Sequence, residues 1–151
     1  MLLLTAVLLL FIAARMRRPA AVDADFGRLR QIIADQAYPT LTKAGTEADL
    51  KRHFDILPAQ VGDVLYLAPA SFIDVDELLL IRLKDGDDGE TIRRAMEKRL
   101  AVLKASFENY GTDQYSLLQQ AQIYQNEKYV CYATGHYSRE LLQTVLREIE
   151  R

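Results

Sequence analysis

The sequence predicts an α+β fold, a two-layer sandwich of a mostly antiparallel four-stranded sheet with a ββαββα core and preceding N-terminal helices. Two observations support this prediction. Apolar segments of strand length occur in two close pairs, residues 64–68 with 78–84 and residues 121–125 with 128–133. After each pair, apolar residues recur at helical spacing. Because the links within the pairs are short, we expect both pairs to be antiparallel.

The N-terminal helices come before the first strand pair. Phe26 and Leu29 lie on the apolar face of a predicted helix that ends before Pro39. Residues 39–45 are expected to form a loop. A capping-box pattern at residues 46–49 then predicts a second, short helix.

The first strand pair differs in pattern from the second. Residues 64–68 form a predicted strand that Pro69 closes. Residues 78–84 have a continuous apolar middle, which is typical of a strand covered on both faces. In the second pair, Asn126 and Glu127 are the expected hairpin turn.

Two helices complete the core. The clearer one follows an acidic turn and carries its apolar residues on one face: Ile92, Met96, Leu100, Leu103 and Phe107. The last helix begins at Ser138. We expect both helices to cover the same face of the sheet.

The domain organisation has three parts: residues 1–18 as a membrane anchor or signal segment, 19–24 as a linker, and 25–151 as one α+β domain. The segment from Leu2 to Ala14 is almost wholly apolar, and arginines follow it at positions 15, 17 and 18. A spanning helix needs about 20 apolar residues. An uncleaved anchor is our first interpretation, with a cleaved signal and a buried helix as alternatives.

The orientation of this segment is ambiguous. Arginines after the apolar run and none before it favour a domain on the cytoplasmic side. An export signal normally carries a basic region before the run, and a start codon further upstream would supply one. We expect a cell-membrane protein, with the membrane as a partner through residues 1–18 and the domain on the extracytoplasmic side.

Composition excludes several function classes. A formal net charge of −2 argues against a nucleic-acid partner. With Cys131 as the one cysteine, neither an internal disulfide nor a cysteine-rich metal site is available. The acidic turn from Asp85 to Glu90 lacks the ligand spacing of a calcium loop. We therefore expect neither a metal site nor a cofactor.

The candidate site residues are few. Arg99 lies near the edge of the apolar helix face, and a partly buried arginine needs a carboxylate partner, for which we choose Glu77 as a structural ion pair. Tyr110, His136 and Tyr137 are binding candidates. We assign no catalytic residue, because no serine-nucleophile elbow, paired-histidine helix or phosphate-binding glycine loop is present.

Three stretches together resemble a known family. They are Asp76-Glu77-Leu78 with the apolar run after it, the helix with Arg99 that ends near Tyr110, and the hairpin that ends at Lys128-Tyr129-Val130. They are similar to domain-of-unknown-function family 4358, a group of small bacterial membrane-anchored or lipoprotein domains. The resemblance covers roughly residues 50–134 and implies fold and location, but no activity. This chain lacks the lipobox cysteine.

Three functional hypotheses follow. The first is a non-enzymatic, membrane-tethered extracytoplasmic domain that binds a protein or another component of the bacterial cell envelope. The second is a small envelope hydrolase or transferase that uses Glu77 and His136, which requires the two side chains to meet in a pocket. The third is a structural accessory subunit of a membrane complex. A small-molecule ligand stays open in all three.

Overall fold

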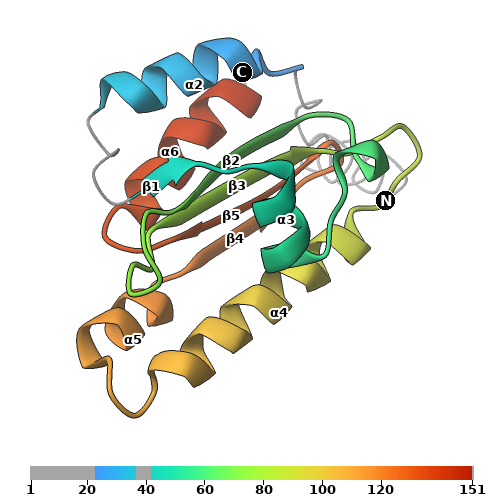
Figure 1. Ribbon diagram of the computed structural model, residues 1–151. Coiled ribbons are helices and arrows are strands. Elements are labelled where there is room, and N and C mark those ends of the chain that lie inside the picture. The colour runs from blue at the N-terminus through green and yellow to red at the C-terminus, as the bar shows by residue number, and fades with distance from the viewer. Residues whose placement is uncertain (1–22, 37–41, 151) are drawn as a thin grey trace, which may run out of the picture.

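The computed structural model describes residues 23–36 and 42–150. The predicted anchor, residues 1–18, and residues 19–22 of the linker lie outside the described residues. The described chain is one α+β unit, which confirms the predicted fold class (Figure 1). In the part of the chain that the structure describes, no helix combines the length and apolarity needed to cross a membrane.

The centre of the molecule is a five-stranded antiparallel sheet with the strand order β1-β2-β3-β5-β4. Its strands are β1 (Thr42–Ala44), β2 (Val64–Pro69), β3 (Glu77–Arg82), β4 (Gln122–Gln125) and β5 (Tyr129–Thr134). The two hairpins that the sequence predicts are β2–β3 and β4–β5. Their long inner strands pair with each other, with Glu77 opposite Thr134 and Arg82 opposite Tyr129.

Helices cover both faces of this sheet (Figure 1). One layer contains α2 (Phe26–Asp35) and α6 (Ser138–Ile149). The other contains α3 (Glu47–Phe54) and α4 (Glu90–Phe107), and a short 3-10 helix, Pro58–Gln60, follows α3. A further helix, α5 (Thr112–Gln119), folds back against the end of α4 and packs with Val75 through Leu118.

Alternation along β3 explains the two helical layers. Leu78 and Leu80 face α2 and α6, whereas Leu79 and Ile81 face α3 and α4. All four side chains have no accessible surface. A strand buried on both faces needs a helix on each side of its sheet. The expectation that α4 and α6 share one face is therefore corrected, since they lie on opposite faces and the domain has three layers.

The fifth strand is the second difference from the predicted fold. Residues 39–45 were expected to form a loop, but Thr42–Ala44 pair with Leu67–Pro69 as the edge strand β1. This strand has three residues and no buried side chain, so it carries no hydrophobic alternation. Gly45 follows it, where a Cβ atom would lie 2.1 Å from the Tyr66 ring. The absent side chain allows the chain to pass over that ring.

Candidate functional site

A buried carboxylate, that of Glu77, is the centre of a polar cluster beneath α3 and α4. Glu77 begins β3 and has no accessible surface. Arg99 of α4, whose side chain is 13% exposed, places Nε 3.1 Å from Glu77 Oε2 and Nη2 3.4 Å from Oε1. The structure thus brings together the two residues that the sequence suggested as an ion pair. Two-point contact between the guanidinium and carboxylate groups compensates the buried negative charge.

Two more side chains complete the hydrogen bonding of this carboxylate. The Tyr66 hydroxyl, from β2, donates to Glu77 Oε1 at 2.7 Å. His53 Nδ1, from α3, lies 2.5 Å from the same hydroxyl and 3.3 Å from Oε1. The Tyr66 hydroxyl has one hydrogen, which it donates to Glu77. It therefore accepts from His53, whose Nδ1–H is the donor in that contact. Four elements, β2, β3, α3 and α4, therefore meet at one buried charge.

The tyrosines of the cluster stay protonated. Burial and the nearby Glu77 charge raise the pKa of the Tyr66 hydroxyl. The same two causes, burial first, raise the pKa of Tyr132. The Tyr132 hydroxyl is fully buried and has no hydrogen-bond partner among the described residues. The two tyrosine hydroxyls therefore stay protonated at neutral pH, and the contacts of the cluster join the sheet to α3 and α4.

A second carboxylate, Asp76, holds His136 at the other side of the same strand end. Asp76 is nearly buried, and its Oδ1 accepts from the His136 backbone N–H at 2.8 Å, while Oδ2 lies 2.9 Å from His136 Nδ1. Gly135 makes this approach possible, because it has φ +93° and its Cβ would lie 2.5 Å from Asp76. The His136 side chain is half exposed.

The proposed enzymatic pair, Glu77 and His136, is not brought together. Glu77 belongs to the buried cluster under α3 and α4. His136 lies in the β5–α6 turn and contacts Asp76, the residue before β3. No group of three or more potential metal-ligating side chains lies close together within residues 23–36 and 42–150. Glu77 and His136 therefore do not form an acid–base pair at one reacting atom.

The two remaining candidates lie at one end of the sheet. Tyr110 is 78% exposed in the turn between α4 and α5, where its ring contacts that of Phe107. Tyr137 is 40% exposed beside the His136 ring, just before α6. Figure 1 shows both turns at the end of the molecule that α5 occupies.

The same end carries two exposed apolar residues that our sequence analysis did not single out. Phe72, which is 93% exposed, and Ile73 lie in the β2–β3 loop. This loop reaches α5 through Val75, which packs with Leu118. We call Phe72, Ile73, Tyr110 and Tyr137 the α5-end surface. The only available signal was two adjacent apolar residues inside a polar connection.

His53 and Asp76 were also not assigned to a site from the sequence. The partners of His53, Tyr66 and Glu77, lie 13 and 24 positions away from it along the chain. Asp76 meets His136 across 60 positions. Side-chain contacts over such separations depend on strand register, which composition and spacing do not reveal.

Fold and site together define a small α+β domain with a sealed ion-pair cluster and an exposed apolar end. The chain belongs to the family described as a domain of unknown function (DUF4358), whose model matches residues 36–135. This confirms the resemblance seen in the sequence. No curated protein and no solved structure matches the chain.

Proposed function

We propose that this protein is a non-enzymatic binding or accessory module of the bacterial cell envelope, tethered to the membrane by residues 1–18 with its domain on the extracytoplasmic side. The observation that carries the binding role is the α5-end surface. Large apolar side chains that are this exposed and share one end of a small domain favour a protein-binding site. Aromatic residues are enriched at such sites.

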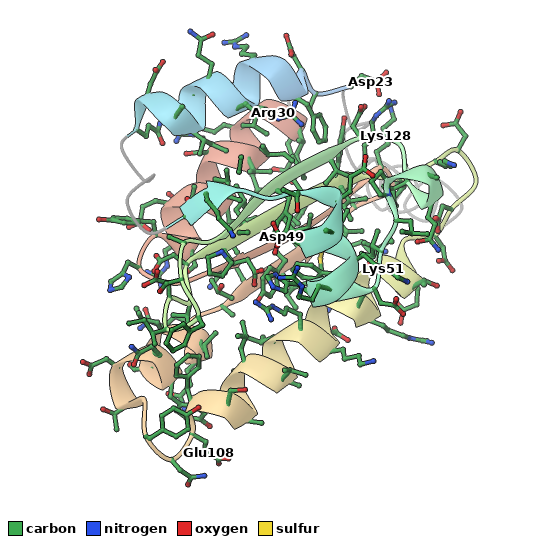
Figure 2. All side chains as sticks on the ribbon, in the orientation of Figure 1. Asp23, Arg30, Asp49, Lys51, Glu108 and Lys128 are labelled. Carbon is green, nitrogen blue, oxygen red and sulfur yellow. The ribbon has the colours of Figure 1, made fainter. Side chains whose placement is uncertain are left out.

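The position of this surface relative to the tether supports the proposal. Figure 2 shows Asp23, where the described chain begins, beside Lys128 at the end of the sheet away from α5. Asp23 pairs with Lys128, and the Ala24 backbone N–H donates to the Tyr129 hydroxyl. The described chain therefore begins at the end of the sheet opposite the α5-end surface, and a tether through residues 1–18 would join the domain at that end.

The enzymatic alternative has less support. A hydrolase or transferase that used Glu77 and His136 would need both groups at one reacting atom. Glu77 is sealed by Arg99 and Tyr66, and His136 is held by Asp76. The accessory-subunit hypothesis is a form of the binding proposal, since a subunit also needs an exposed contact surface.

Topology is tested by protease treatment of intact cells that produce the full chain, followed by mass spectrometry of the mature N-terminus. We expect the domain to be removed and the apolar segment to be retained. A domain that stays protected until the cells are lysed would place it in the cytoplasm and overturn the proposed location.

Binding is tested by a photo-crosslinking amino acid introduced at position 72 of the full chain in the same cells. The control position is Leu57, which is also exposed and apolar but lies after α3, outside the α5-end surface. We expect a discrete crosslinked protein from position 72 and none from position 57. Equal labelling at the two positions would contradict a binding role for this surface.

A further inference from the structure

The sheet has an open edge at β4. Asn126 N–H donates to the Tyr129 carbonyl at 2.9 Å, so residues 126 and 129 form a hydrogen-bonded pair of the β4–β5 ladder. Such pairs alternate along antiparallel strands. Tyr124 and Gln122 therefore direct their backbone groups toward β5, while Ile123 and Gln125 direct theirs away from the sheet.

These outward groups have no partner within the described part of the chain. No hydrogen bond reaches the backbone N–H or C=O of Ile123 or Gln125 from outside the β4–β5 ladder. On one side of them, the Ala121 N–H already bonds the Leu118 carbonyl, and on the other the Asn126 N–H bonds Tyr129. The free edge thus consists of two residues placed symmetrically about Tyr124.

The opposite edge of the sheet is guarded, and this one is not. Arg30 Nη2 of α2 donates to the Val64 carbonyl of β2 at 2.6 Å, and β1 carries Lys43. Charged side chains of this kind block pairing at sheet edges. By contrast, residues 114–126 contain neither a charged side chain nor a proline. An identical edge can therefore approach this one without repulsion between like charges.

We propose that a second copy of this chain pairs with β4 in antiparallel orientation, about a two-fold axis at Tyr124. Ile123 of one copy then lies opposite Gln125 of the other, and every free backbone group of both edges is used. Because both edges are uncharged, no like charges on β4 oppose each other. The two sheets join into one continuous sheet.

This symmetry is compatible with a membrane on one side. An axis perpendicular to the sheet keeps the α2 and α6 layers of both copies on the same side. The chain enters α2 from Asp23, so both N-terminal segments leave from that layer. The pairing itself depends only on β4 and does not require the proposed tether or the α5-end surface.

Cysteine crosslinking of the full chain in mild detergent tests the pairing. In the proposed register the two copies of residue 124 face each other with Cα atoms about 4.5 Å apart, within reach of a disulfide. The two copies of residue 122 are four positions out of register, about 13 Å apart. Tyr124→Cys should therefore form a disulfide dimer with copper phenanthroline in air, and Gln122→Cys should not.

Both positions lie on the same strand and face, and both are half-buried, which makes them matched controls. Because the native Cys131 lies directly opposite residue 124 on β5, both variants are made in a Cys131→Ala background, which by itself should form no disulfide-linked dimer. If Tyr124→Cys crosslinks no more than Gln122→Cys, the proposal is wrong.

A second pair of variants tests whether the edge hydrogen bonds matter. Added to Tyr124→Cys, Gln125→Pro removes the outward N–H, whereas Gln125→Ala keeps it; both lose the side-chain bond to the Asp88 carbonyl. We expect a several-fold lower crosslinking yield with proline only. Equal yields would overturn the proposed register. A cooperative urea transition followed by circular dichroism checks that the Gln125→Pro chain folds.

Discussion

Removing the cation from the buried cluster should be more damaging than removing the whole ion pair. In Arg99→Met, the fully buried Glu77 keeps the Tyr66 hydroxyl and His53 but loses its two guanidinium contacts. Breaking a buried pair from one side costs about 3–5 kcal/mol, because an uncompensated charge stays behind. For a domain of this size, that is a fall in Tm of roughly 10 °C or more.

The double variant Glu77→Leu with Arg99→Met removes both charges and should recover part of this loss, since apolar replacements of similar volume are often neutral or stabilising. Recovery is partial because the Tyr66 hydroxyl loses Glu77 as its acceptor and keeps only His53. Arg94→Met is the matched control on the same helix, because Arg94 forms an exposed pair with Glu90. We expect it to change stability by less than about 0.5 kcal/mol. Urea unfolding followed by circular dichroism measures all three.

Either of two results would contradict this role of the Arg99–Glu77 ion pair. One is a loss below about 1 kcal/mol for Arg99→Met, which would mean that water or another group solvates the Glu77 carboxylate. The other is a double variant no more stable than Arg99→Met, which would mean that the arginine acts through packing rather than charge.

Three further predictions concern buried groups. Tyr132→Phe should leave stability unchanged or raise it, since the Tyr132 hydroxyl has no partner among the described residues. Tyr66→Phe should lose about 1.5–3 kcal/mol, because the Tyr66 hydroxyl donates to a charged group. Urea unfolding of the two variants compares them. Gly135→Ala should be clearly less stable than Gly86→Ala in thermal melts: both have positive φ, but only the first Cβ meets atoms within 4 Å. Burial raises the pKa of Cys131 to about 12, and those of the two tyrosines also rise. Folding therefore favours the neutral forms of Cys131 and the two tyrosines. The resulting contribution to the free energy of unfolding is fully present below the pKa that each group has in the unfolded chain, about 8.5 for cysteine. It is lost as the pH rises above that value. The urea midpoint should accordingly fall between pH 8 and pH 11, and a flat profile would contradict this assignment.

The sequence carried enough information for the elements that are long or strongly patterned. The apolar stripe of α4 and the two hairpins were predictable because their hydrophobic periods extend over several residues. The number of layers was predicted wrongly, although the continuous apolar middle of residues 78–84 already indicated a strand covered on both faces. Placing α4 and α6 on one face conflicted with that pattern.

The site was predictable only in part, for a related reason. Arg99 and Glu77 could be matched because Arg99 lies at the edge of the apolar face of α4 and Glu77 directly precedes the apolar run of β3. His53 and Asp76 sit at element ends, where no periodicity constrains the side-chain direction. The exposure of Phe72 follows from the course of a connection, which the sequence specifies weakly.

The α2/α6 layer unites the first and last helices of the described chain, and this has a consequence for biosynthesis. During translation, one face of β3 and β5 has only α2 to cover it until α6 leaves the ribosome. Leu78, Leu80 and Cys131 lie on that face and pack against Val145 and its neighbours. A chain stalled or truncated before Ser138 would expose them to solvent and to aggregation. Reactivity of the Cys131 thiol would therefore report, residue by residue, when a nascent chain closes its last layer.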